Sequence, residues 1–278
     1  LSTRWAADEL RLGKTPSGLV RSGWRLTDAQ ARDLRRLELL GGEPLLHQDQ
    51  IADALARVAA HGDISQLQVD ITTNATVLPD HTLRSLLARC GEVNFTLSVD
   101  ALGPLNDYVR TGTDWHTTVS VLDGFAQLCR SVPSCNWLIM TLISMLNANV
   151  LDDLWCWADD RWGCTILAHP LQEPAHYDAR LMPVSLRETT LSRYLALSQS
   201  RPRLAAPLRT AVDYLTAQGL SVRANLADFS AITDRLDQLQ GLSLHSVNPA
   251  LYAACMVDSW GVEPQPAPCR GAVLPLSL

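Results

Sequence analysis

LQVDITTN (residues 67–74) is predicted to be a β-strand, and the segments that follow it decide the fold. A helix is expected at residues 79–91, with Pro79 near its start and Gly91 after its end. VNFTLSVD (residues 93–100) is then a second strand. A strand, a helix and a second strand in this order are typical of two parallel strands joined by a helical crossover.

The same alternation extends in both directions. Upstream, a strand at 35–40 precedes a helix at 47–62, in which Ile51, Leu55, Val58 and Ala59 share one face. Downstream, the expected elements are a helix at 114–130, a strand at 136–146, a helix at 149–160 and a strand at 163–170. In the helix at 114–130 the inward residues are Val119, Leu122, Phe125, Ala126 and Cys129.

Five strands that alternate with helices, several of them apolar throughout, predict an α/β fold with a parallel sheet covered by helices. An open sheet and a partial barrel both fit this pattern. We expect a core at residues 1–183, a mostly helical C-terminal extension at 184–250 and a poorly ordered, proline-rich tail at 251–278.

Composition excludes several classes of protein. The 278 residues are 47% hydrophobic and 19% charged, which is typical of a globular protein. The net charge of −6 disfavours a surface for nucleic acid, because phosphate contacts need clustered Lys and Arg. The longest apolar run, at 137–146, is too short to cross a bilayer, and we find no signal peptide, so a cytoplasmic protein with no membrane partner is expected.

Polar residues gather where the predicted strands end. In parallel α/β folds, ligands bind beyond the carboxyl ends of the strands. The ends are GGEP (41–44), TTNAT (72–76), SVDA (98–101), SMLN (144–147) and AHP (168–170). In GGEP the glycines let backbone approach a ligand, and Pro44 disfavours helical geometry at Glu43. This segment suits a small zwitterion, with carbonyls and a carboxylate facing an ammonium.

Three of these segments, taken in order, resemble a known family. GGEP, TTNAT and SVDALGPLNDYVRTGTDWHTTV (98–119) are similar to the radical S-adenosylmethionine enzymes, in particular the subgroup with a shortened accessory "twitch" region. The resemblance covers residues 1–183 and continues more faintly to about residue 250, where FSAITDRLDQLQGLSLHSVNPAL (229–251) is similar to the end of that subgroup. It implies a partial (β/α)6 TIM-like barrel whose first strand is missing from this chain.

The resemblance also implies a reaction and its participants. A [4Fe–4S] cluster would cleave S-adenosylmethionine reductively to a 5′-deoxyadenosyl radical, which abstracts hydrogen from a peptide or small-molecule substrate. An electron donor such as flavodoxin or ferredoxin would supply the electron. No catalytic hydrogen donor can be named from these residues.

The resemblance implies a role for individual residues in each of the matching motifs. Gly41, Gly42, Glu43 and Pro44 would hold the methionine ammonium. Ser98 and Asp100 would lie near the ribose, and Arg110 would face the methionine carboxylate, which suits its planar fork of donors. The same pocket would include three residues at the other strand ends: Asn74, Ser144 and Asn147.

The chain departs from the family in its cysteines. The family's CxxxCxxC cluster motif is absent, and the seven cysteines have no metal-binding spacing: Cys90, Cys129, Cys135, Cys156, Cys164, Cys255 and Cys269. The opening LSTRW resembles the family's segment immediately after the third cluster cysteine, and residues 2–13 are predicted to be a helix with Ser2 or Thr3 as N-cap. We therefore expect a fragment that begins downstream of its cluster ligands and does not bind the cluster itself.

Other interpretations remain open at this point. The protein could be a non-catalytic, degenerate barrel that binds a nucleoside or a peptide, or a barrel hydrolase using Glu43 and Asp100 as an acid–base pair. Taken singly, Glu43 could be solvated in a glycine turn, Ser98 and Asp100 could cap a helix, and Arg110 could pair with Asp107 or Asp114 on the surface.

Further downstream, two groups of residues have structural interpretations. His169, Glu173 and His176 lie in a segment with two prolines and no helical register, which disfavours a metal site. The tryptophans are expected to pack helix against sheet: Trp155, Trp157 and Trp162. Cys255 and Cys269 are interpreted as unpaired residues of the tail.

Overall fold

The computed structural model of the chain describes residues 25–217 and 222–257. The helix expected at residues 2–13 and the tail from residue 258 onwards, with Cys269, lie outside the described residues.

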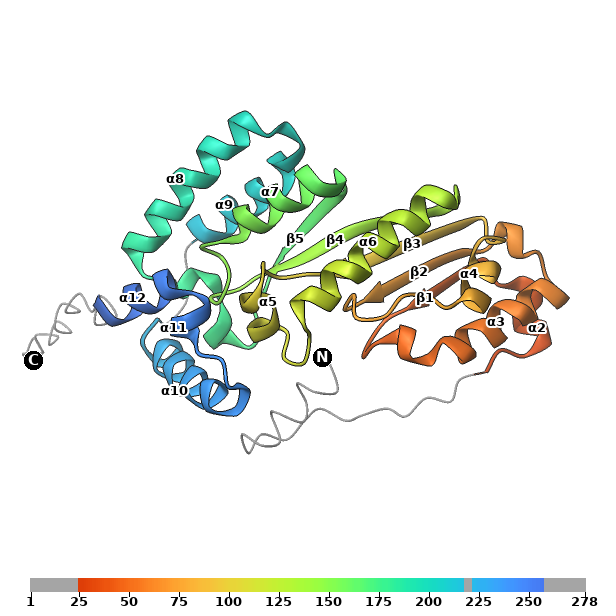
Figure 1. The fold of residues 1–278 in the computed structure, drawn as a ribbon, viewed down its shortest axis with the longest axis horizontal. Helices are drawn as coiled ribbons and strands as arrows, with labels where there is room; N and C mark the ends of the chain where they lie inside the picture. Colours follow the sequence, from red (N-terminus) through yellow and green to blue (C-terminus); the bar gives the residue numbers. More distant parts are fainter. Residues whose placement is uncertain (1–24, 218–221, 258–278) are drawn as a thin grey trace, which may run out of the picture.

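Five parallel strands form one sheet in the order β1-β2-β3-β4-β5 (Figure 1). Their bounds are β1 Arg36–Leu39, β2 Gln68–Thr73, β3 Glu92–Ser98, β4 Cys135–Ile143 and β5 Thr165–Pro170. Each strand pairs in parallel with the next one along the chain. The predicted α/β class and all five predicted strands are therefore confirmed, with ends shifted by a few residues.

Helices connect the successive strands. They are α2 Asp28–Asp33, which precedes β1, then α3 Gln48–His61, α4 His81–Leu87, α5 Pro104–Val109, α6 Trp115–Ser131 and α7 Leu151–Trp162. Because strands that follow one another also lie next to one another, right-handed crossovers return on the same face of the sheet each time. Phe95 of β3 and Phe125 of α6 meet on that face, with ring centroids 4.9 Å apart.

Local sequence explains where several helices begin and end. The Asp80 carboxylate accepts a hydrogen bond from Leu83 N at 2.8 Å and so caps α4, directly after Pro79. Helix α7 ends at Gly163, whose φ of +59° is left-handed. In α6 the predicted inward face is largely confirmed, but Val119 is only half-buried, and Thr118 beside it is the buried residue.

The opposite face of the sheet carries polar residues near the start of the strands. The Asp70 carboxylate accepts hydrogen bonds from Arg36 Nε at 2.7 Å and from Asn94 Nδ2 at 3.0 Å, each on a neighbouring strand. Asn136 Nδ2 on β4 donates to Asn94 Oδ1 at 3.3 Å. These polar residues form a ladder across β1 to β4 on this face, so β2 and β3 are not apolar throughout.

The tryptophans pack as predicted. Trp155 is fully buried, and its Nε1 donates to Thr141 Oγ1 of β4 at 3.3 Å. Trp157 and Trp162 stack edge to face with ring centroids 4.8 Å apart, and Trp162 meets Trp137 of β4 at 5.5 Å. Helix α7 is therefore attached to the sheet by aromatic contacts.

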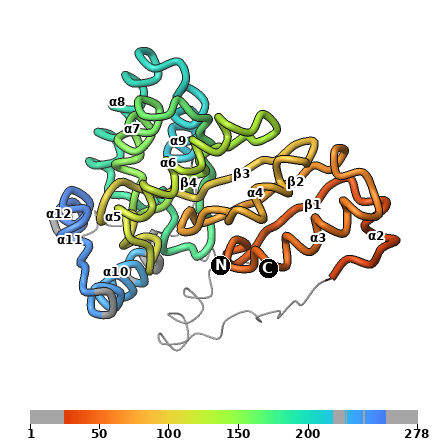
Figure 2. The backbone as a smooth tube through the Cα atoms, turned by 45° about the vertical axis from the view of Figure 1, so that its right-hand side comes forward, coloured from red at the N-terminus to blue at the C-terminus, as the bar shows by residue number. Residues whose placement is uncertain are grey.

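The C-terminal part is helical. It comprises α8 Val184–Ser200, α9 Ala205–Thr216, α10 Val222–Gln240, α11 Leu244–Val247 and α12 Pro249–Val257, gathered with α7 on the left of Figure 1. Short 3-10 helices at Ala175–Tyr177 and Ala179–Leu181 lead from β5 to α8. In both ribbon and tube views, α5 lies beside α10 and α11 (Figure 2), and residues of α11 contact α5.

The end of the chain corrects one expectation. Residues 251–257 were expected to belong to a poorly ordered tail, but they are helical in α12, with Leu251 and Cys255 buried. Asn248, just before this helix, exchanges two side-chain hydrogen bonds with Asn149, at 2.8 and 3.0 Å. This buried amide pair fastens the start of α12 to the loop after β4.

Across the two described ranges, every helix is too short or too polar to serve as a membrane span.

Candidate functional site

The candidate site lies at the carboxyl edge of the sheet, where the ends of β1 to β4 lie in a row. At the end of β1, Gly41 and Gly42 have φ values of +87° and +28°. Both angles are left-handed, so residues with a Cβ would be strained there. Glu43 follows in an extended conformation, and Pro44 begins the 3-10 helix Pro44–His47. The glycine turn is exposed, which leaves its backbone carbonyls open to a ligand.

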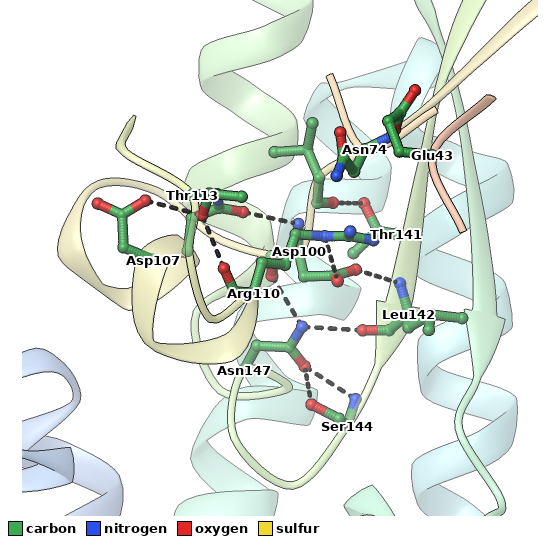
Figure 3. Close-up of polar contacts among 12 residues, drawn as sticks. Glu43, Asn74, Asp100, Asp107, Arg110, Thr113, Thr141, Leu142, Ser144 and Asn147 are labelled. Atoms are coloured by element: carbon green, nitrogen blue, oxygen red, sulfur yellow. Dashed lines mark hydrogen bonds and ion pairs between the residues drawn. The ribbon is translucent and has the colours of Figure 1, made fainter. Parts of the chain in front are cut away.

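The Glu43 carboxylate ties the end of β1 to the end of β2. Oε1 accepts hydrogen bonds from Thr73 Oγ1 at 2.7 Å and from Leu45 N at 3.1 Å. Oε2 accepts one from Asn74 N at 2.7 Å, and Figure 3 places Glu43 beside Asn74. The interpretation of Glu43 as a solvated side chain is therefore wrong, because three protein donors hold it.

The end of β2 is a tight polar turn. Asn74 Oδ1 accepts hydrogen bonds from Thr76 N at 3.1 Å and from Thr76 Oγ1 at 2.6 Å. Ala75 is fully buried with φ +58°, a left-handed conformation that few non-glycine residues adopt. Among the described residues nothing accepts a hydrogen bond from Asn74 Nδ2, so this donor is available.

At the end of β3, Asp100 is held on several sides. Its Oδ1 accepts a hydrogen bond from Leu142 N of β4 at 2.7 Å, and its Oδ2 lies 2.8 Å from Arg110 Nε. Its backbone N donates to Asn106 Oδ1 at 3.2 Å. Ser98, the last residue of β3, is half-buried, and its hydroxyl has no partner in the described part of the chain.

Arg110 pairs with Asp100, not with a surface carboxylate (Figure 3). The interpretation of a surface pair with Asp107 or Asp114 is wrong, because Asp107 instead accepts hydrogen bonds from Thr113 Oγ1 and Trp115 N, both at 3.0 Å. The Arg110 side chain is 20% exposed. Over the described ranges, no protein acceptor takes a hydrogen bond from its Nη atoms, so the end of the guanidinium remains free for an anion.

Asn147 and Ser144 close the end of β4. Asn147 is fully buried, and its Nδ2 donates to Asp100 O at 2.7 Å and to Leu142 O at 2.8 Å. Its Oδ1 accepts from Ser144 N at 2.8 Å and from Ser144 Oγ at 2.9 Å. Both polar atoms of the Asn147 amide are therefore occupied by protein partners, and the bond to Asp100 O fixes the backbone of Asp100.

Apart from Ser98, the predicted polar residues thus fall into two hydrogen-bonded groups at one edge of the sheet. One group joins β1 to β2 through Glu43, and the other joins β3 to β4 through Asp100. Within the described residues, no hydrogen bond or ion pair links Glu43 to Asp100. This arrangement disfavours the acid–base hydrolase, because each of the two carboxylates is held within its own group and they are not paired with each other.

Two residues were missed from the sequence. Thr73 is 1% exposed and positions Glu43, and Asn106 is fully buried beside Asp100. The Nδ2 of Asn106 is a buried donor without a partner among the residues described. Both lie inside motifs that the sequence singles out, TTNAT and NDYVRTG, so the motifs themselves were the available signal.

The remaining potential metal ligands do not converge. Over residues 25–217 and 222–257 no three His, Cys, Asp or Glu side chains group so that they could hold a metal ion. His169 and Glu173 are exposed, whereas His176 is buried with its ring 4.4 Å from that of Tyr177.

Five of the described cysteines are held in the protonated form. Burial raises the pKa of Cys90 and Cys164 to about 11 and that of Cys129 to about 12. Burial also raises the pKa of Cys135 and Cys156. An iron–sulfur cluster needs several cysteines that converge on one point, and the described part of the chain contains no such group of ligands, so these residues do not fit a cluster.

No protein-family model matches the chain. No curated protein matches it.

Among solved structures, the chain is similar to several proteins at low identity. It is 14% identical to anSMEcpe with bound AdoMet, with 62% of this chain and 48% of that one covered and a TM-score of 0.45. It is 17% identical to Streptococcus suis SuiB bound to S-adenosylmethionine, covering 59% and 37% with a TM-score of 0.40. It is 15% identical to the radical S-adenosylmethionine methyltransferase TsrM from Kitasatospora setae, with cobalamin and a [4Fe–4S] cluster bound, covering 81% and 48% with a TM-score of 0.41. The chain spans about half or less of the length of these proteins.

Proposed function

We propose that the carboxyl edge of the sheet binds S-adenosylmethionine, and that the fold is a partial (β/α)6 barrel of the radical S-adenosylmethionine type with a twitch-like helical C-terminal part. The sequential strand order supports the barrel, since crossovers that all return on one face let a twisted sheet curl toward closure. A doubly wound sheet would instead reverse its strand order at a switch point.

The observation that carries the proposal is the set of free donors and acceptors at this edge. The Nη atoms of Arg110 suit a carboxylate, and the exposed carbonyls of Gly41 and Gly42 suit an ammonium. The Ser98 hydroxyl and Asn74 Nδ2 have no protein partner in the described residues, and they suit ribose hydroxyls or adenine. These groups match the polar ends of a nucleoside joined to an amino acid.

Glu43 has a supporting part in this proposal. Three protein donors already occupy its carboxylate, which has about four lone-pair positions. It can therefore accept at most about one more hydrogen bond from a ligand ammonium, while it holds the glycine turn in place. Asn147 and Pro44 act in the same way, by fixing backbone next to the ligand.

An iron–sulfur cluster does not fit the described residues of this chain, because their side chains form no group that could hold a metal ion and the cysteine motif is absent from the sequence. In the proposal, cluster ligands come from sequence outside these 278 residues, and this chain contributes the binding and orientation of S-adenosylmethionine. The reaction on a peptide or small-molecule substrate, the flavodoxin- or ferredoxin-like electron donor and the cytoplasmic location belong to the whole protein and are part of the proposal.

The same misfit favours a second candidate, a non-catalytic barrel that binds a nucleoside or a peptide. The codons upstream of Leu1 separate the two. If these codons encode three cysteines in the CxxxCxxC spacing, in frame with this chain, the result supports the enzyme. If they contain an in-frame start codon and no such cysteines, only the interpretation as a non-catalytic binding protein remains.

Calorimetric titration of the chain with S-adenosylmethionine tests the site itself. We expect binding, and we expect Arg110→Gln to weaken it about tenfold or more, because a charged hydrogen bond to the carboxylate is lost. The matched control is Arg161→Gln, which breaks another Arg–Asp pair, with Asp123, on the surface of α7. Absence of binding, or equal affinity in the Arg110 and Arg161 variants, would contradict the proposal.

A further inference from the structure

Helix α5 is fastened to the sheet at its first turn. The side chain of Asn106 is fully buried, and its Oδ1 accepts a hydrogen bond from Asp100 N at 3.2 Å. The backbone O of Asn106 accepts one from Arg110 N at 2.8 Å, so Arg110 is the residue that ends the helix. The backbone of Arg110 therefore follows any shift of α5 relative to β3.

A second connection joins α5 to the C-terminal helices. Tyr108 is 2% exposed, and its hydroxyl donates to Asp237 Oδ1 of α10 at 2.7 Å. The Asp237 carboxylate also accepts from Leu244 N, the first residue of α11, at 3.1 Å from each oxygen. A single carboxylate thus connects three helices: α5 is distant in sequence from α10 and α11, and it lies beside them in Figures 1 and 2.

The surroundings of this contact keep the Tyr108 hydroxyl protonated. Burial raises the pKa of Tyr108 above its ordinary value, and the hydrogen bond to Asp237 raises it further. Tyr108 therefore remains a neutral phenol that donates its proton to Asp237.

The position of α5 matters because Arg110 is only partly restrained by its own contacts. Its Nε lies 2.8 Å from Asp100 Oδ2, but the N–H is not directed at that oxygen. Its backbone, with φ −109° and ψ 67°, is no longer helical. The direction of the guanidinium thus depends on where the last turn of α5 lies, and polar recognition is sensitive to displacements of about 1 Å.

We propose that Tyr108 and Asp237 are positioning residues that aim the guanidinium of Arg110 at the carboxylate of the ligand, so that the C-terminal helices determine how that carboxylate is recognised. This inference rests on the proposed binding of S-adenosylmethionine.

The test compares two ligands that differ in one group. S-adenosylmethionine carries the carboxylate, whereas decarboxylated S-adenosylmethionine keeps the adenosine, the sulfonium and the ammonium. The ratio of the two dissociation constants measures recognition of the carboxylate alone. Loss of general stability would weaken both ligands together, so this ratio separates positioning from a merely structural role.

In Tyr108→Phe, which removes only the hydroxyl, we expect the preference for S-adenosylmethionine to fall about threefold to tenfold, the range produced by the loss of one hydrogen bond. Affinity for the decarboxylated ligand should not change. Asp237→Asn should act in the same direction, and the double variant should be no worse than the stronger single variant, because both act on one contact. Tyr252→Phe, the same chemical change on α12, should leave both affinities as they are.

The outcomes distinguish the two proposals. If the unaltered chain binds neither ligand, or if Arg110→Gln keeps the full preference, the proposed function fails and this inference fails with it. If Arg110→Gln abolishes the preference but Tyr108→Phe and Asp237→Asn retain it, or weaken both ligands equally, only the positioning role is overturned.

Discussion

The side-chain Nδ2 of Asn147 lies 2.7 Å from the backbone oxygen of Asp100, which joins the loop after β4 to the residue just beyond β3. The same amide bonds to Leu142 and, through its oxygen, to Ser144. A buried loop between two strand ends is stable only if its backbone groups are paired, and Asn147 supplies those partners.

Asn147→Ala should therefore lower the free energy of unfolding by about 2–4 kcal/mol, because several buried backbone groups lose their partner. Urea unfolding followed by circular dichroism measures it. Asn136→Ala is the matched control, since Asn136 is exposed and makes one hydrogen bond, at 3.3 Å. Asn136→Ala should lower the free energy of unfolding by about 0.5 kcal/mol or less. Equal costs for the two variants would contradict the role assigned to Asn147.

Thr73→Val should lower the free energy of unfolding by about 1–2 kcal/mol, because the buried hydroxyl that donates to Glu43 is lost at nearly constant volume. Glu43→Gln should couple to it, with a double-mutant interaction energy of about 0.5 kcal/mol or more. Thr72→Val, on the other face of the same strand, is the control and should have little effect. Additive effects of the Thr73 and Glu43 changes would show that the two side chains act independently.

Asp178 should contribute to stability in a pH-dependent way. Burial alone would raise the pKa of its carboxyl, but the hydrogen bonds and the charge of Arg180 outweigh burial and lower it. The folded-state pKa is below the unfolded one, so the contribution is complete above about pH 4 and is lost as the pH falls further.

In Asp178→Asn the loss of stability below about pH 4 should accordingly be smaller than in the unaltered protein. Thermal unfolding at a series of acidic pH values measures this difference. The control is Asp49→Asn, which replaces an exposed carboxylate in the first turn of α3. This variant should lose as much stability below about pH 4 as the unaltered protein does. An identical acid slope in Asp178→Asn and in the unaltered protein would contradict the prediction.

Cys90, Cys129 and Cys164 should react slowly with iodoacetamide in the native protein. With a pKa of about 11 for Cys90, only about one thiol in a thousand is a thiolate at pH 8, and the thiolate is the nucleophile. Labelling followed by mass spectrometry should find these peptides modified quickly only in concentrated guanidinium chloride. Rapid native labelling of Cys90 would mean that its surroundings are open to solvent.

Asn248→Ala should loosen the C-terminal helices more than the sheet. The variant removes both bonds to Asn149 and the bond from Asn248 Nδ2 to Leu146 O at 2.9 Å. Hydrogen exchange should rise in residues 244–257, with little change in β2 and β3. Ser246→Ala, in an exposed capping box at α11, is the milder control. Faster exchange throughout the sheet would indicate global destabilisation instead.

The strands and helices could be predicted closely because their signals are local. Apolar residues recur at helical spacing in residues 48–61. Pro79 and Asp80 lie directly before α4, and Gly163 lies directly after α7, so each of these residues is next to the helix end that it favours. The error at residues 251–257 has a physical cause. Proline-rich sequence farther on suggested disorder, whereas burial of Leu251 and Cys255 against the rest of the protein stabilises a helix there.

The partners of the site residues could not be predicted in the same way. Arg110 has Asp107 and Asp114 within four residues, yet it pairs with Asp100, which lies across the turn between β3 and α5. Glu43 is separated by thirty residues from Thr73, which donates to it. Such pairings depend on which strand ends lie next to each other, and local sequence does not contain that information.

By itself, the sequence determined the order of the strands and of the longer helices between them, though not the short helices α2 and α5, and it determined the polar character of each strand end, because hydrophobic periodicity and turn residues act over a few positions. Only the tertiary structure decided that the strands lie in sequential order, that the end of β1 is bonded to that of β2 and the end of β3 to that of β4, and that Asp237 reaches Tyr108. Those contacts join residues up to 129 positions apart, and their formation requires the whole sheet and the C-terminal helices to be assembled first.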